Sequence, residues 1–253
     1  DNLAKLLDQT DTRPAVETYH ELTHQYQELQ TLFSLGGIGL SERAIGEQTY
    51  LRTCQSLLSQ LSSTNRTHLE IAEELHDKLA DKYFCNLSVF QSMPDVWGID
   101  QLFPIAPIHR LNVAPDRHAI LYDLTCDSDG HIENYIGNEE TKRTLPLHAP
   151  QEGYLLGFFM LGAYQETLGD IHNLFGDTHS VDAHISDNGQ FSLNNLIVGD
   201  STKRVLELVQ LSAEHLNNHF NAKLDNIQIS DTLKQEAKAA FNASLESYTY
   251  LIK

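Results

Sequence analysis

The hydrophobic period of this chain changes twice along its length, and this limits the folds that it can adopt. In the first part apolar residues recur every three or four positions, as in Tyr19, Leu22 and Tyr26, which predicts helices with one buried face. From 86 to 200 that period disappears, and turn-forming residues separate short apolar or β-branched runs. The helical period returns from 202 to 252. The sequence therefore predicts an α+β protein.

We expect three domains along the chain. Residues 1–85 are predicted to form a small helical bundle, 86–200 a mainly antiparallel β-sheet or barrel domain, and 201–253 a C-terminal helical segment. The runs predicted as strands in the middle domain are Leu87–Phe90, Phe103–Ile108, His118–Thr125, Tyr154–Tyr164, Val181–Ile185 and Phe191–Val198.

The charge balance excludes some classes of partner. The chain has 17 Lys and Arg against 35 Asp and Glu, a formal net charge of −18, which argues against nucleic acid or an anionic membrane and favours cationic ligands. The middle segment, 86–200, carries 16 of the acids and 4 of the bases. We expect the chemistry to lie there, although an ordinary solvated acidic surface explains the same count. The sequence also has no apolar run long enough to span a membrane.

The cysteines indicate the compartment, and the methionines indicate how the chain begins. The three cysteines are odd in number and lack CxxC spacing, so we expect reduced thiols and a cytoplasmic location. Both methionines are internal and residue 1 is Asp, so we expect a processed or truncated product.

Two glycine-containing motifs invite a functional interpretation. The run Gly36-Gly37-Ile38-Gly39 lacks the Gly-Lys-Ser/Thr of a phosphate loop and the third glycine of GxGxxG, so a turn between helices is preferred. The run Asp127-Ser-Asp129-Gly130 resembles the core of a calcium loop but lacks the acid at its twelfth position. A β-turn is preferred, and it places Cys126 at the tip of a hairpin, where it is either reactive or simply buried.

A histidine cluster runs from His172 to His184. Asp182 and His184 would share one face of a strand, whereas His179 would face the other way, so a metal triad needs a bend between them. Hydrogen-bonded or solvent-facing side chains are preferred over a zinc or iron site, and no metal ligand is assigned.

Three stretches carry a resemblance to a known family. They are Leu87–Pro104, which contains Gln-Ser-Met-Pro-Asp-Val-Trp-Gly, Leu124–Gly130, and Gly157–Asp177. They resemble the C-terminal portion of the bacterial biosynthetic arginine decarboxylases, which belong to the pyridoxal-phosphate-dependent class related to alanine racemase and ornithine decarboxylase. The resemblance extends more loosely over the whole chain.

The resemblance implies roles for four residues. Cys126 would be the general acid that returns a proton to the substrate, acting in the active site of a partner subunit. Asp127 would bind the cationic end of the substrate, and Asp95 would be a second carboxylate for that end. Tyr164 would donate a hydrogen bond to the cofactor phosphate.

The same resemblance implies the whole reaction and its requirements. The complete enzyme would convert L-arginine to agmatine in polyamine biosynthesis, as a homodimer or larger oligomer that depends on Mg²⁺. Its catalytic barrel and Schiff-base lysine would lie upstream of residue 1, so the isolated chain would be inactive. A catalytically silent homologue or assembly module that regulates a decarboxylase is the alternative, and a metal-dependent hydrolase using the histidine cluster is a third.

Overall fold

The computed structural model describes residues 2–10, 13–137 and 141–252, and it shows an α+β chain. Packing divides the chain into two compact units. Unit 1 contains 1–82, 110–120 and 142–154, and unit 2 contains the remainder. The prediction of an α+β fold is confirmed, but the described strands form small antiparallel sheets and not a closed barrel. The three-domain division along the sequence stays a prediction.

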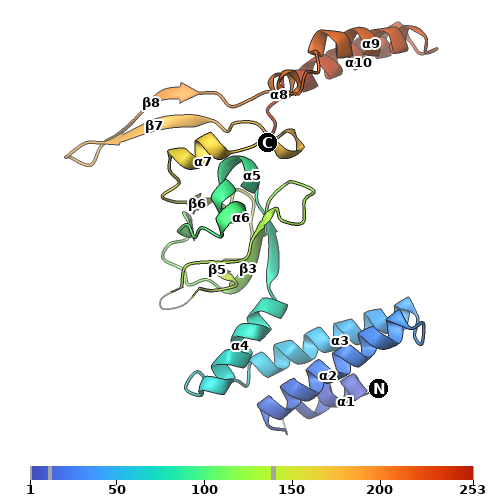
Figure 1. The fold of residues 1–253 in the computed structure, drawn as a ribbon, viewed down its shortest axis with the longest axis vertical. Coiled ribbons are helices and arrows are strands. Elements are labelled where there is room, and N and C mark those ends of the chain that lie inside the picture. The colour runs from blue at the N-terminus through green and yellow to red at the C-terminus, as the bar shows by residue number, and fades with distance from the viewer. Residues whose placement is uncertain (1, 11–12, 138–140, 253) are drawn as a thin grey trace. The chain divides into compact units, whose positions relative to one another are not determined.

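Unit 1 is built on four helices that bury one common face. They are α1 (Asn2–Gln9), α2 (Ala15–Ser34), α3 (Leu40–Leu58) and α4 (Arg66–Lys78), and α2 runs beside α3 in Figure 1. The core contains Leu22, Leu57 and Leu75, which come from three different helices and are fully buried. The three-and-four spacing found in the sequence therefore marks the packed face.

The turn between α2 and α3 uses the glycines that resemble a phosphate loop. Gly36 has φ +73°, a left-handed conformation that ends α2 at little steric cost. The Glu42 carboxylate accepts a hydrogen bond from the Gly39 N–H at 2.6 Å and so caps α3. The turn interpretation is correct, and helix α3 begins at Leu40.

The boundary between the units falls within two strands, β1 (Asp81–Phe84) and β3 (Arg117–Tyr122). In unit 1 the first part of β3 pairs antiparallel with β5 (Leu145–Leu147). In unit 2 its last residues pair with β4 (His131–Ile132), and the loop that joins β3 to β4 carries Cys126.

The remaining elements of unit 2 include a second small sheet and several short helices. Strand β2 (Ile105–Pro107) pairs with β6 (Leu156–Phe158). The short helices α5 (Val89–Ser92), α6 (Pro94–Ile99) and α7 (Ala163–Leu168) pack against one another, and a 3-10 helix, η2 (His172–Leu174), follows α7.

Two strand predictions in unit 2 were wrong in whole or in part. The run Leu87–Phe90 leads into helix α5, because the Ser88 side chain accepts a hydrogen bond from the Gln91 N–H and caps a helical turn. The run Tyr154–Tyr164 forms a strand only at 156–158 and enters helix α7 at Ala163. Short apolar runs do not distinguish strands from buried helical turns.

Strands β7 (Ser180–Ile185) and β8 (Phe191–Ile197) form a separate hairpin, and every residue in them is exposed in this chain. Their register places Ile185 opposite Phe191 and Ala183 opposite Leu193, so these apolar side chains share one face. The prediction of two strands here is confirmed.

Three helices follow the hairpin: α8 (Thr202–Leu208), α9 (Ala213–Asp225) and α10 (Asp231–Leu245). The helical period found from 202 to 252 is interrupted after α8, because Gln210 adopts φ +64° and Ser212 caps a new helix. Among the described residues no helix is both long and apolar enough to cross a membrane.

Candidate functional site

The loop between β3 and β4 presents Cys126 and Asp127 at the surface of unit 2. The Gly130 N–H donates to the Asp127 carbonyl at 3.1 Å, which closes the predicted β-turn, and the Asp127 carboxylate accepts from the Asp129 N–H at 2.9 Å. Cys126 is exposed and carries a free thiol. The turn interpretation of this motif is thus confirmed, and the thiol is accessible to a ligand.

A buried carboxylate below the turn fixes the base of the loop. Asp123, only 2% exposed, accepts hydrogen bonds from the Val89 N–H and from both the N–H and the hydroxyl of Thr125. A Cβ at Gly130 would lie 2.3 Å from Asp123 Oδ1, so only glycine fits there. These contacts join the loop to helix α5 and limit its conformations.

A second segment of unit 2 contacts the exposed end of the loop. The Asn173 side-chain oxygen accepts a hydrogen bond from the Cys126 N–H at 3.0 Å. His172 Nε2 lies 3.6 Å from Asp127 Oδ2, which makes an ion pair when the imidazole is protonated. The candidate acid and the candidate substrate carboxylate are therefore both in contact with the η2 segment.

An aromatic cluster connects this segment to α6. The buried ring of Phe90 lies 4.6 Å from the His172 ring and 5.4 Å from the Trp97 ring, measured between centroids. The indole N–H of Trp97 donates to Asp129 at 3.3 Å. The loop, η2 and α6 are thus held together around one buried side chain.

The other two predicted site residues lie on α6 and α7, which are joined by a reciprocal pair of hydrogen bonds. Asp95 donates its backbone N–H to Gln165 Oε1 at 3.1 Å and accepts from Gln165 Nε2 at 2.5 Å. Gln165 is buried, and the preceding residue, Tyr164, is 76% exposed. The structure thus brings Asp95 next to the helix that carries Tyr164. Cys126 and Asp127 lie together in the β3–β4 loop.

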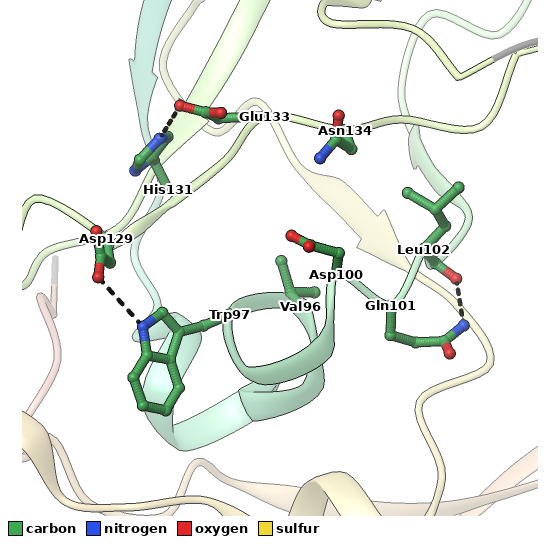
Figure 2. A pocket seen from close by; sticks show the side chains of 9 residues that line it. All are labelled: Val96, Trp97, Asp100, Gln101, Leu102, Asp129, His131, Glu133 and Asn134. Atoms are coloured by element: carbon green, nitrogen blue, oxygen red, sulfur yellow. Dashed lines mark hydrogen bonds and ion pairs between the residues drawn. The ribbon is translucent and has the colours of Figure 1, made fainter.

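Beside the loop lies an acidic cavity of about 310 Å³ (Figure 2). Figure 2 shows its lining side chains arranged around an open space, and they include the carboxylates of Asp100, Asp129 and Glu133. Glu133 contacts His131 Nε2 at 2.6 Å, and the other lining residues are Val96, Trp97, Gln101, Leu102 and Asn134. Some of the acidic residues concentrated in 86–200 therefore line a concave surface.

The histidine cluster is not assembled into a metal site. His172 faces Asp127, whereas His179 Nδ1 accepts the Gly199 N–H at 2.8 Å and its ring stacks on Tyr248. Asp182 accepts a hydrogen bond from Asn195 at 2.7 Å. Within the described ranges no three His, Cys, Asp or Glu side chains are grouped so that they could hold a metal ion. The hydrogen-bonded interpretation of His179 and Asp182 is confirmed.

Sequence reasoning missed Asp123, Asn173 and the acids of the cavity. Asp123 is one of many acids in the middle segment, and no neighbouring residue in the sequence indicates that its side chain is buried. His172 and Asn173 had a weak signal in the sequence, because they belong to the dense histidine cluster that runs from His172 to His184. The contact between Asn173 and Cys126 crosses 47 positions of sequence and could not be derived from spacing.

Two sequence families match separate parts of the chain. Residues 1–76 match the arginine decarboxylase helical bundle domain, and residues 202–251 match the arginine decarboxylase C-terminal helical extension. The chain belongs to the arginine decarboxylase family. The resemblance found in the sequence is thereby confirmed, and it concerns the C-terminal portion of the family's proteins.

Full-length relatives in this family show how much of the protein the chain represents. It is 45% identical over 252 residues to the biosynthetic arginine decarboxylase of Marinobacter nauticus, with 99% of this chain and 40% of the relative covered. It is also 45% identical over 244 residues to that of Alkalilimnicola ehrlichii, with 95% and 39% covered. The chain thus spans about 40% of the length of the curated relatives it matches.

A solved structure in the arginine decarboxylase family has the same fold. The crystal structure of the biosynthetic arginine decarboxylase SpeA from Campylobacter jejuni superposes with a TM-score of 0.78 at 29% identity. All of this chain and 40% of that chain are covered. A fold with a helical bundle, small sheets and C-terminal helices is therefore shared with that enzyme.

Proposed function

We propose that this chain supplies the proton donor and part of the substrate site of a pyridoxal-phosphate-dependent arginine decarboxylase. That enzyme, a carboxy-lyase, converts L-arginine to agmatine and CO₂ for polyamine biosynthesis. The observation that carries the proposal is the exposed Cys126–Asp127 turn, which is held by Asp123 below and by Asn173 beside it. Relatives named as biosynthetic arginine decarboxylases, 45% identical over nearly the whole chain, support the same conclusion.

The described residues fit a supporting role toward the cofactor. The Tyr164 hydroxyl is exposed on α7 and suits donation to a phosphate oxygen. Bound pyridoxal phosphate supplies the electron sink that makes loss of CO₂ possible. We assign no residue of this chain to covalent attachment, which we place in the part of the enzyme that this chain does not include. Mg²⁺, implied by the family, receives no ligand here.

Cys126 would carry out the step that follows departure of CO₂. The bond between the α-carbon and the carboxylate breaks, and the electron pair left behind must take up a proton at the α-carbon. The Cys126 thiol donates that proton and is then reprotonated from solvent, so the net reaction exchanges CO₂ for one proton. A well-placed acid of this kind contributes a factor of about 10² to 10⁴.

Asp127 and Asp95 would recognise the guanidinium of arginine. A carboxylate offers acceptors that match the fork of guanidinium donors. One oxygen of each is already engaged, by the Asp129 N–H in Asp127 and by Gln165 in Asp95, so each side chain has a fixed direction. The acids of the neighbouring cavity, together with the net charge of −18, also favour a cationic substrate.

We also propose that the active site is shared between subunits of a homodimer or larger oligomer in the cytoplasm. The Cys126 thiol is exposed in this chain, and a proton donor must be enclosed with its substrate. A second polypeptide that covers the turn would enclose it. The three free cysteines agree with a reducing compartment.

The test is an assay of the complete decarboxylase polypeptide with arginine and pyridoxal phosphate, with agmatine and CO₂ both measured. We expect Cys126→Ala to lower kcat by about 10² to 10⁴ while cofactor absorbance is unchanged. Unaltered turnover would remove Cys126 from this role. A complete polypeptide that binds cofactor but forms no agmatine would instead favour the silent, regulatory homologue. The isolated chain should release no CO₂.

A further inference from the structure

We infer that His172 and Asn173 are positioning residues that fix the Cys126–Asp127 turn for proton transfer and substrate binding. The inference rests on the proposed decarboxylase function, because it takes Cys126 as the acid and Asp127 as the substrate carboxylate. It adds two residues on a different segment, η2, and assigns each a separate kinetic effect.

The first argument is that two adjacent residues of η2 contact the two adjacent residues of the turn. Asn173 accepts the Cys126 N–H at 3.0 Å, and His172 Nε2 lies 3.6 Å from Asp127 Oδ2. Among the described residues the Cys126 backbone N–H donates only to Asn173, so this hydrogen bond fixes the peptide plane from which the thiol projects. Loss of this acceptor would leave the Cys126 N–H without its hydrogen bond and would let the turn change conformation.

The second argument is the backbone of η2. Asn173 and Leu174 have φ +55° and +62°, and they are the only two adjacent non-glycine residues with positive φ in the part of the chain that the structure describes. Such conformations are costly, above all for a leucine, and they persist only where surrounding contacts impose them. The conformation directs the Asn173 amide toward the Cys126 N–H.

The third argument is that both ends of this segment are anchored to other elements. The Asp170 N–H donates to the Phe90 carbonyl at 3.1 Å, and the Asp170 carboxylate accepts the His172 N–H at 2.8 Å. Further along, the Tyr250 hydroxyl donates to the Gly176 carbonyl at 2.9 Å. The segment is therefore a rigid support against which the exposed turn is held.

The two contacts predict different kinetic consequences. Asn173 acts on the cysteine backbone, so its loss should lower kcat with little change in KM. His172 acts on the carboxylate proposed to bind guanidinium, so its loss should mainly change KM for arginine. Both act through the turn and neither is proposed to touch substrate.

The experiment uses three variants of Asn173 in the complete decarboxylase. Asn173→Gly keeps the left-handed backbone but removes the acceptor, Asn173→Asp keeps both, and Asn173→Ala removes both. We expect kcat to fall about tenfold in the glycine and alanine variants and to be largely retained in the aspartate variant. His172→Leu should raise KM, and His215→Leu, on the exposed face of α9, should leave both constants unchanged.

A measurement that does not depend on catalysis separates this inference from the proposed function. Hydrogen exchange of the Cys126 amide should accelerate at least tenfold in Asn173→Gly and stay slow in Asn173→Asp. Wild-type levels of kcat and exchange in the glycine variant would overturn the inference, even if arginine is decarboxylated. If exchange is faster in Asn173→Gly but the wild-type enzyme makes no agmatine, the contact between Asn173 and Cys126 is supported and the proposed function is rejected.

Discussion

The buried carboxylate of Asp123 accepts the backbone N–H of Val89 at 2.9 Å and so joins the β3–β4 loop to the first turn of helix α5. Its other oxygen accepts the N–H and the hydroxyl of Thr125. One side chain thus holds both the element that follows β1 and the loop that presents Cys126. Four predictions follow from the contacts around this loop and from the packing of unit 1.

Asp123→Ala should destabilise unit 2. It leaves buried donors without an acceptor, and each such donor costs about 1–3 kcal/mol, so we expect the free energy of unfolding to fall by about 3 kcal/mol. Urea unfolding followed by fluorescence of Trp97, the single tryptophan, measures this loss. Asp187→Ala, at the exposed tip of the β7–β8 hairpin, is the control. A loss below about 0.5 kcal/mol would show that water replaces the carboxylate.

Gly130→Ala should also destabilise the loop, for a steric reason. The added methyl would lie 2.3 Å from Asp123 Oδ1 and 2.4 Å from the Thr125 hydroxyl, so the loop must shift at a cost of about 1–3 kcal/mol. The matched control is Gly98→Ala in α6, where a Cβ meets nothing within 4 Å and alanine favours the helix. Equal stabilities of the two variants by the same fluorescence assay would contradict the prediction.

The thiols should react in a fixed order. Cys126 is exposed, whereas burial raises the pKa of Cys54, and burial together with the Asp123 charge raises that of Cys85 to about 11. Because the thiolate is the reactive form, iodoacetamide at neutral pH should modify Cys126 of the isolated chain first, as mass spectrometry of timed samples can show. Cys126→Ser should abolish the fast reaction. Early labelling of Cys54 in the wild type would mean that unit 1 opens readily.

Unit 1 should lose stability in acid because of a histidine pair. The rings of His76, on α4, and His118, on β3, stack with centroids 3.8 Å apart. Burial lowers the pKa of both, and the charges of His76 and Lys142 lower that of His118 further, while Glu73 opposes the shift at His76. The unfolded chain therefore binds more protons than the folded one at pH values below the ordinary histidine pKa of about 6.5.

The free energy of unfolding of unit 1 should accordingly be fully retained above that pH and should fall as the pH drops below it. Far-ultraviolet circular dichroism during urea unfolding at several pH values measures the slope. His76→Phe should reduce the slope, whereas His24→Phe, on the exposed face of α2, should not. An unchanged slope in the first variant would show that the stacked pair is not the cause.

The helical parts could be predicted because their information is local. The apolar stripe through Tyr19 and Leu22 marks the face that packs, and the glycine at 36 ends α2 where the sequence indicates a turn. The turn at Asp127–Gly130 was equally predictable, since Asp and Gly favour its ends. Prediction failed at Leu87–Phe90, where an apolar run fits both a strand and the buried helical turn that Ser88 caps.

The sequence by itself determined the α+β class, the helix faces, the turn that exposes Cys126 and, through its resemblance, the family. Only the tertiary structure decided which side chains hold that turn. Asp123 is buried where it accepts the N–H of Val89 in α5. Asn173 accepts the N–H of Cys126 because η2 is anchored at both ends. Such contacts depend on how distant segments pack, and hydrophobic period and residue spacing describe only neighbours along the chain.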